Sequence, residues 1–516
     1  MQPTAVPHTE IPGASKLFLD YLYHFDRVAG FFAHHPYDRA SFDQAARRLN
    51  YPSSRRAALI AALRGDNPDS SLLDRLAQPK TVVVVTGQQT GLFAGPSYTI
   101  YKALTAVRLA HRLTDAGIPA VPVFWCATED HDFDEVRRVW LFDAAHQPQR
   151  LSIDGAFPGQ PVGPIAPASY PVVELSQMLA GFPFAGEVME WVRRSYAPGV
   201  TMGQAFRNLL GQMLAPHEML FLDPLRAPVR ALAAPLLREA ARASEDLIRI
   251  VQQRNGDLAA AGYHVQVQVS GETPLFFQLA NGRRNSLPRR AEGYPELERV
   301  PETLSPNALL RPVMQDYLLP TIAHVAGPAE IAYLAQSHAL YGRLGVAPPV
   351  EVPRAAFTLL DARSQKLLDR YGLTFQSLFA GEEAVKEAMA KRLMPEGFKD
   401  SFRNTETQVK SALATLRQEI NAFDHTLGAA MDKSTAKILY QISKIERKVA
   451  REALRRREAA VAEAAHVSRL LLPHRHLQER FYSILPFLAK HGPDVVERIL
   501  ENINLDSPDH ILLPLS

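Results

Sequence analysis

The sequence predicts an α/β fold, with a doubly wound core on a parallel sheet followed by a long helical segment. Between about residues 80 and 360, apolar runs rich in valine and isoleucine alternate with helical patterns. The clearest unit is the apolar run 81–87, a helical pattern over 97–116 and a second apolar run over 121–127. Strands that are apolar on both faces belong in a parallel sheet that helices cover on both sides. These observations together favour a doubly wound core.

The strand-then-helix order returns twice further along the chain. Residues 219–223 form a short apolar run before a long helical pattern from about Val229 to Asn255. Residues 321–326 form another, before a helix expected from Pro328 to about Gly342. Both units extend the same predicted parallel sheet.

Two stretches interrupt this order, and we interpret both as insertions in a core that spans residues 1–380. The first, about 145–200, is rich in proline and glycine and has no strong periodicity. The second, about 262–310, contains the alternating runs 264–269 and 275–279, which are typical of a small β element.

The segment 381–500 predicts a coiled-coil domain. Its apolar residues recur at alternating spacings of four and three, which is a heptad seam formed by Val409, Leu413, Leu416, Ile420, Phe423 and Leu427. Gly428 offers a helix stop, and Asp432 or Ser434 a new N-cap before the seam resumes at Ile438. We expect an antiparallel hairpin that can bind a second subunit, and a C-terminal segment, 501–516, that returns to the core.

Composition excludes several classes of protein. The 516 residues include 57 basic and 54 acidic side chains, a net charge of +3, which argues against nucleic acid as the main ligand. The single cysteine, Cys126, excludes an internal disulfide framework and a multi-cysteine zinc site. Because it lies in an apolar strand, we interpret it as a core residue. No positively charged leader precedes an apolar segment, and the apolar runs are too short to cross a membrane. We expect a cytoplasmic protein.

A polar loop follows the first predicted strand, where parallel α/β sheets bind ligands. Its glycines permit tight turns, and free N–H groups at the start of the next helix favour an anion. A turn with an ordinary helix cap is the alternative. Lys102 lies four residues after Tyr98, so both side chains can share the helix face towards the loop. The candidate binding residues of this loop are Gly87, Gln88, Gln89, Gly91, Gly95 and Tyr98.

A second polar loop, 129–135, follows the strand 121–127 and surrounds His131 with five carboxylates. Such a cluster at the end of a buried strand is costly unless it is solvated, paired or used. It could bind a cation such as Mg²⁺, hold a substrate ammonium, or place His131 for acid–base work. An acidic helix N-terminus is the structural alternative. We favour the functional interpretation, with Glu129 and Asp132 beside His131 as catalytic candidates.

A third polar patch lies near residue 310. Asn307, Arg311 and Gln315 are four residues apart and would line one helical face. Gly327 and the proline after it repeat the glycine-proline helix start of the first loop, which indicates a second anion-facing helix end or an ordinary cap.

These motifs resemble a known family. The residues that carry the resemblance lie at 82–110, 121–136, 304–336, 348–361 and 503–515. They include the blocks GQQTGLFAGPSYTIYK and EDHDFDE, and they follow one another over nearly the whole chain. On them the sequence resembles the bacillithiol-forming, cysteine-adding enzymes of the BshC family. The two insertions match more loosely.

The resemblance implies a Rossmann-like core similar to class I nucleotidyltransferases, with connecting-peptide insertions and a coiled-coil domain used for dimerisation. It implies a cysteine ligase that adds L-cysteine to glucosaminyl-malate in the last step of bacillithiol biosynthesis. A free carboxylate is a poor electrophile, so we expect activation by ATP with Mg²⁺, no tightly bound cofactor and no metal held by protein ligands.

On this interpretation several of the candidate residues have an expected role. His131 removes the proton of the attacking amine, and Glu129 and Asp132 hold the ammonium of cysteine. Arg311 is a suitable fork for the malate carboxylates. The phosphate cradle comes from Gly87–Gly95, Gly327 and Lys102. The alternatives are a nucleotidyltransferase or nucleotide hydrolase on the same core, and a non-catalytic coiled-coil dimer that binds a nucleotide.

Overall fold

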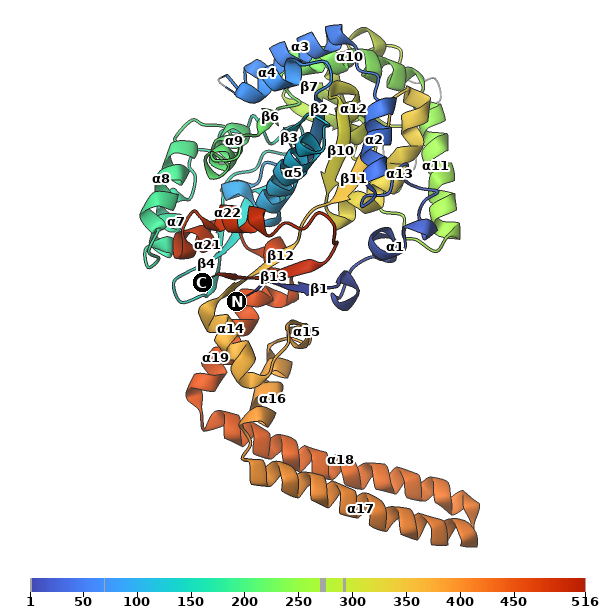
Figure 1. Ribbon diagram of the computed structural model, residues 1–516, viewed down its shortest axis with the longest axis vertical. Coiled ribbons are helices and arrows are strands. Elements are labelled where there is room, and N and C mark those ends of the chain that lie inside the picture. Colours follow the sequence, from blue (N-terminus) through green and yellow to red (C-terminus); the bar gives the residue numbers. More distant parts are fainter. Residues whose placement is uncertain (1, 69, 270–274, 291–293, 516) are drawn as a thin grey trace. The chain divides into compact units, whose positions relative to one another are not determined.

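The computed structural model describes residues 2–68, 70–269, 275–290 and 294–515. The chain divides into two compact units, shown in Figure 1. Unit 1 contains residues 1–359 and 478–515, and unit 2 contains residues 360–477. Unit 2 begins about twenty residues before the expected boundary at 380, because the helices that follow residue 361 pack within it. It ends about twenty residues before the expected boundary at 500, because residues 478–515 group with unit 1.

A five-stranded parallel sheet forms the centre of unit 1, which confirms the predicted fold class. Its order is β11-β10-β2-β3-β6. The chain runs outward from β2 through β3 to β6 and then returns to β10 on the other side of β2, so the strand order reverses between β2 and β10. Ligands bind at such a reversal in doubly wound folds. The strands are β2 (Val82–Gln88), β3 (Ala120–Cys126), β6 (Leu220–Leu222), β10 (Thr321–Ala326) and β11 (Val350–Pro353).

Helices cover this sheet and bury its apolar side chains. Helix α5 (Tyr98–Asp115) packs against β2 and β3. Alternate strand residues, such as Val83 and Val121, cluster instead with apolar side chains of other helices. Among these helices are α3 (Ser53–Arg64), α4 (Ser71–Ala77), α10 (Ala227–Arg242) and α12 (Arg311–Leu318). At the β10 side, α13 (Pro328–Leu344) packs against α1 (Lys16–Tyr23), and α2 (Arg39–Arg48) contacts β10 and β11.

The helix expected from Val229 to Asn255 is in fact two helices. Helix α10 ends at Arg242, and α11 (Ser244–Ala260) begins after a break at Ala243. The change of direction lets α10 pack against α12 while α11 packs against α13. Two separate packing partners therefore explain why one continuous helical pattern does not form one helix.

The first insertion consists of a hairpin and three helices. Strands β4 (Arg138–Phe142) and β5 (Pro148–Ser152) pair antiparallel. The helices are α7 (Val172–Leu179), α8 (Ala185–Ser195) and α9 (Met202–Met213). Thr201 caps the start of α9, and its side chain accepts a hydrogen bond from the Gln204 N–H.

The second insertion contains a three-stranded antiparallel sheet of β7 (Phe276–Ala280), β8 (Arg283–Ser286) and β9 (Leu304–Pro306). The alternating run 275–279 coincides with β7. The run 264–269 forms no strand, so that part of the expectation is wrong. Gln336 satisfies the backbone there instead: its Oε1 accepts from the Val267 N–H at 2.9 Å, and its Nε2 donates to the Val267 carbonyl at 2.7 Å.

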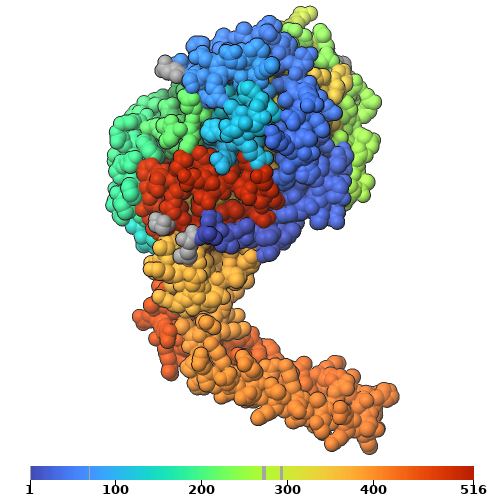
Figure 2. All heavy atoms as spheres, viewed as in Figure 1, coloured from blue at the N-terminus to red at the C-terminus, as the bar shows by residue number. Residues whose placement is uncertain are grey.

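The C-terminal residues lie in unit 1. Strand β13 (His510–Leu515) pairs antiparallel with β1 (Thr4–Val6) and has β12 (Phe357–Asp361) on its other side. Before it, α21 (Leu485–His491) packs against α8, and α22 (Val495–Glu501) packs against α5. Figure 2 shows this segment, in red, spread over one face of unit 1 beside the blue N-terminal residues.

Unit 2 is helical, and two long helices form the expected antiparallel hairpin. They are α17 (Glu396–Phe423) and α18 (His425–Arg455). The turn lies at Asp424, whose side chain accepts a hydrogen bond from the Thr426 N–H, so the expected stop at Gly428 is wrong. A Cβ on Gly428 would lie 2.8 Å from Asn421 Oδ1, so this glycine lets the two helices approach closely. Asp432 and Ser434, the expected N-caps, lie inside α18.

The remaining helices of unit 2 are α14 (Ala362–Tyr371), α15 (Phe375–Leu378), α16 (Glu382–Leu393) and α19 (Glu458–Leu471). Helix α16 packs against both α18 and α19. Among the described residues of both units, no helix has the length and apolar character that crossing a membrane requires.

Candidate functional site

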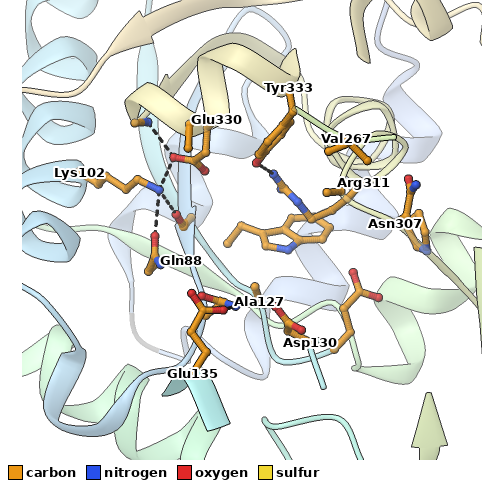
Figure 3. A pocket seen from close by; sticks show the side chains of 18 of the residues that line it. Gln88, Lys102, Ala127, Asp130, Glu135, Val267, Asn307, Arg311, Glu330 and Tyr333 are labelled. Atoms are coloured by element: carbon orange, nitrogen blue, oxygen red, sulfur yellow. Dashed lines mark hydrogen bonds and ion pairs between the residues drawn. The ribbon is translucent and has the colours of Figure 1, made fainter. Parts of the chain in front are cut away.

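A cavity of about 580 Å³ opens at the carboxyl ends of β2, β3 and β10 (Figure 3). All its lining residues belong to unit 1. Nine residues that the sequence singled out line it: Gly87, Gln88, Gln89, Tyr98, Lys102, Glu129, Asn307, Arg311 and Gly327. Five others do not line it: Gly91, Gly95, His131, Asp132 and Gln315.

A hydrogen-bonded bridge joins the glycine loop to the acidic loop. The Gln89 side-chain amide donates to Asp130 Oδ2 and to Glu135 Oε2, each at 2.8 Å. Both carboxylates line the cavity. The two polar loops therefore converge on one cavity, at the strand ends where the sequence placed them.

Lys102 links the carboxyl end of β2 to the first turn of α13 through hydrogen bonds and an ion pair. Its Nζ donates to the Gly87 carbonyl at 2.8 Å and to Gln88 Oε1 at 3.0 Å, and it forms an ion pair with Glu330. Three acceptors use the three N–H bonds of an ammonium group. Burial lowers the pKa of Lys102 below its ordinary value, although Glu330 opposes this effect. Lys102 thus has no N–H left for a phosphate in this arrangement.

A protein acceptor also takes one N–H group at each of the two helix starts that the sequence marked as anion sites. The Gly327 N–H donates to Glu330 Oε2 at 2.7 Å, and the Ser97 N–H donates to the Tyr482 carbonyl at 2.8 Å. Gly95 has φ = 66° and packs against Gly91. A Cβ placed on Gly91 would lie only 3.2 Å from the Gly95 Cα. These two glycines therefore form a tight turn that buries Phe93 and stay outside the cavity lining.

Glu129 is buried in the cavity wall, with 3% of its surface exposed. Its Oε2 accepts from Ser305 Oγ at 2.8 Å and lies 3.4 Å from Arg230 Nη1. Its Oε1 has no hydrogen-bond partner among the described residues. Asp132 is exposed and caps the short helix α6 (Phe133–Val136), accepting from the Glu135 N–H at 3.1 Å. For Asp132 the geometry corresponds to the helix-cap alternative.

His131 lies beside the cavity and does not line it. Its Nδ1 is 3.1 Å from Nη1 of Arg284 and 3.7 Å from Oδ1 of Asp130. Its ring lies 5.3 Å from the ring of Phe277. Burial and the Arg284 guanidinium lower the pKa of His131 below its ordinary value. The imidazole is therefore neutral near neutral pH.

Arg311 enters the cavity at the start of α12. Its guanidinium donates to Gln315 Oε1 at 3.0 Å and to the Tyr333 hydroxyl at 3.2 Å. No carboxylate pairs with it among the described residues. Gln315 is fully buried behind it, and Asn307 precedes the helix, where its Oδ1 accepts from the Leu309 and Leu310 N–H groups. The expected single helical face is therefore wrong, because only two of its three residues are helical.

Two family models match the chain along its length. The N-terminal Rossmann-like domain of bacillithiol biosynthesis BshC matches residues 1–355, and the C-terminal coiled-coil domain of the same family matches residues 357–515. The chain belongs to the BshC family. This confirms the resemblance drawn from the motifs and the family's role in bacillithiol biosynthesis.

Relatives with the name "Putative cysteine ligase BshC" match the chain from end to end. The protein of Solibacter usitatus is 49% identical over 99% of both chains. That of Koribacter versatilis is 34% identical over 97% of this chain and 98% of its own. That of Salinibacter ruber is 33% identical over 98% of this chain and 97% of its own.

Sequence reasoning missed several cavity residues of this BshC-family chain: Trp125, Phe277, Arg284, Arg354 and Arg480. Trp125 follows from the strand register, since it pairs with Gly87 across β2 and β3. The arginines come from the second insertion and from segments that return late in the chain. Arg354 forms a buried ion pair with Glu479, with Nη2 2.6 Å from Oε1. No sequence spacing connects residues so far apart.

The acidic residues of the cavity do not form a metal cage. Among the described residues, no group of three or more histidine, cysteine, aspartate or glutamate side chains is arranged to hold a metal ion. The cavity instead contains positive and negative side chains that are not paired with each other. Arg311 and Arg480 have no carboxylate partner among the described residues, and Asp130 and Glu135 have no lysine or arginine partner there.

Proposed function

We propose that this protein joins the carboxyl group of L-cysteine to the amine of glucosaminyl-malate, the step that completes bacillithiol. Membership of the BshC family and the name of its relatives support this activity. The observation that carries the proposal is the charge separation in the cavity. Figure 3 shows Arg311 and Glu135 on different sides of it. A cavity with unpaired groups of both signs suits substrates that carry both signs.

The unpaired groups match the charges of the two substrates. The ammonium of cysteine is complementary to the carboxylates of Asp130 and Glu135, with the free oxygen of Glu129 deeper in the wall. Malate carboxylates are complementary to Arg311, whose planar fork can bind a carboxylate through two N–H groups. Arg480, exposed at the cavity, adds a second cation for an anionic group.

We propose ATP with Mg²⁺ as the source of activation, because a free carboxylate does not react with an amine at useful rates. An amide bond then forms between the carboxyl carbon of cysteine and the amine nitrogen, the amine gives up a proton, and the phosphate-bearing group leaves. Lys102 and the Gly327 N–H already have partners. The cations available to phosphates are therefore Arg311, Arg480 and the paired Arg354. We place this reaction in the cytoplasm, where a single cysteine stays reduced.

Reconstitution tests the activity. Purified protein is incubated with cysteine, glucosaminyl-malate, ATP and Mg²⁺, and mass spectrometry follows both the thiol and the nucleotide products. We expect a product with the mass of both substrates less one water, formed only when both are present. Omitting ATP tests the activation step separately. Nucleotide turnover that does not depend on cysteine would favour the nucleotidyltransferase or hydrolase alternative.

We also propose that the protein forms a homodimer through α17 and α18. The hairpin leaves apolar side chains exposed, and Phe423 at its tip is 87% exposed. Leu416, Leu427 and Ile445 are exposed by 43%, 46% and 55%. Light scattering after size exclusion should give twice the chain mass. A Phe423→Ser, Leu427→Ser variant should run as a monomer; a dimer that persists in it would exclude this surface.

A further inference from the structure

Arg284 is held in place from several directions at once. Its Nε donates to Ser305 Oγ at 2.9 Å, and its Nη2 donates to the Pro306 carbonyl at 2.7 Å. Its guanidinium carbon lies 4.0 Å from the centre of the Phe277 ring. Its remaining terminal nitrogen, Nη1, lies 3.1 Å from Nδ1 of His131. The position of Arg284 is thus fixed by groups of β7 and β9, independently of His131.

This contact determines which nitrogen of His131 carries the proton. A guanidinium has only N–H donors and no acceptor, and it does not lose its charge in proteins. Nδ1 of His131 must therefore be the acceptor, with its lone pair towards Arg284. In a neutral imidazole the proton then sits on Nε2. A proton on Nδ1 would place two donors and two positive charges against each other.

Among the described residues, three charged groups act on His131: Arg284 from β8, and Asp130 and Asp132 from its own loop. The aspartates favour the charged imidazole, whereas burial and Arg284 disfavour it more strongly. Both nitrogens are therefore unsuited to accept a proton: one lone pair is bound by Arg284, and the other nitrogen already carries hydrogen.

We propose that Arg284 is a positioning residue that fixes His131 as the neutral Nε2–H form, so that His131 donates a hydrogen bond and does not serve as the base. The amine proton then passes to a carboxylate of the cavity. Asp130 and Glu135 are the candidates for this role, because neither has a lysine or arginine partner among the described residues. The role of the proton acceptor rests on the proposed ligase function. The tautomer of His131 does not depend on it.

Nuclear magnetic resonance of the full chain labelled with ¹⁵N-histidine tests the tautomer without any turnover. A His131→Gln variant identifies the His131 signals by their absence. We expect an unprotonated Nδ1, a protonated Nε2 and a pKa below that of an ordinary histidine. An Nδ1–H form in the wild-type protein would overturn the proposal, whether or not any variant folds.

An Arg284→Met variant removes the donor and keeps an apolar stem over Phe277. The pKa of His131 should then rise, since a nearby positive charge is lost. Arg283→Met, on the exposed neighbour in the same strand, is the matched control and should leave it unchanged. An unchanged His131 pKa in a folded Arg284→Met protein would contradict the proposal.

The pH profile of thiol formation supplies the second readout. If His131 only donates, His131→Gln should lower kcat while the acidic limb of the kcat/KM profile keeps its midpoint. Loss of that limb would show that His131 is the base. If no thiol forms at all, the ligase proposal fails, and the resonance measurement still decides the tautomer.

Discussion

The backbone of Gly87 lies directly against Trp125. The two residues pair across β2 and β3, and a Cβ on Gly87 would lie 2.7 Å from the Trp125 carbonyl oxygen and 2.9 Å from its Cβ. Trp125 is fully buried, and both residues line the cavity. The first glycine of the loop is therefore needed for the close approach of two strands at the cavity wall.

A Gly87→Ala substitution should therefore destabilise unit 1 by roughly 1–3 kcal/mol, because backbone and a buried indole would have to shift. Gly186→Ala in α8 is the control, since no atom lies within 4 Å of its Cβ position. That control should be neutral or slightly stabilising, as alanine favours a helix. Thermal unfolding checks both; equal melting temperatures for wild type and Gly87→Ala would refute the steric argument.

Lys102 should contribute to the stability of unit 1 through its ion pair with Glu330. Removing it leaves the Glu330 carboxylate without its cation, and breaking a buried ion pair typically costs about 3–5 kcal/mol. Lys102→Met should therefore lower the denaturation midpoint, and Lys102→Met with Glu330→Gln should recover part of the loss. Urea unfolding measures both variants. Unchanged stability in Lys102→Met would contradict a stabilising role of the Lys102–Glu330 ion pair.

Arg311→Lys should weaken binding of the malate part of the acceptor. The lysine keeps the positive charge and loses the planar fork, so we expect KM for glucosaminyl-malate to rise about tenfold or more, with a smaller change for cysteine. Arg283→Lys, on an exposed strand, should change neither. Steady-state kinetics with each substrate varied in turn distinguishes the two. A rise confined to cysteine would place the amino acid at Arg311 instead.

Asp316 should make stability depend on pH. Burial raises its pKa to about 6, although hydrogen bonds from Tyr341 and Gln315 oppose this. Between pH 4 and 6 the folded protein holds a proton that the unfolded chain has lost, so stability falls as pH rises through this window. At one pKa unit per 1.36 kcal/mol, the loss is about 3 kcal/mol by pH 7.

An Asp316→Asn variant should lack this part of the pH dependence. The difference in unfolding free energy between wild type and variant, measured in urea at pH 4 and at pH 7, should change by about 2–3 kcal/mol. A constant difference across that range would mean that Asp316 titrates alike in both states.

Much of the fold could be predicted because it depends on local patterns. The apolar runs at 81–87, 121–127 and 321–326 are strands in the parallel sheet, since burial on both faces requires continuous apolar sequence. The turn of the hairpin could not be placed from the heptad alone. Gly428 resembles a helix stop, but its role is close packing against Asn421, which depends on the partner helix.

The location of the site could be predicted, whereas the state of its residues could not. The strand-end rule placed Gln89 and Asp130 at one cavity, where their side chains form a hydrogen bond. The partners of Lys102 and His131 come from distant segments, Glu330 and Arg284. No spacing rule reveals such partners, and they decide whether a lysine or histidine is available for chemistry.

On the proposed function, the charged cavity of unit 1 is where cysteine is joined to its acceptor. The most direct test measures thiol product by mass spectrometry for wild type and for an Arg311→Ala, Glu135→Gln variant shown to be folded by circular dichroism. We predict product with the wild type and a loss of at least about a hundredfold in the variant, as two charged contacts are removed. Product formation at the wild-type rate by the folded variant would contradict the claim.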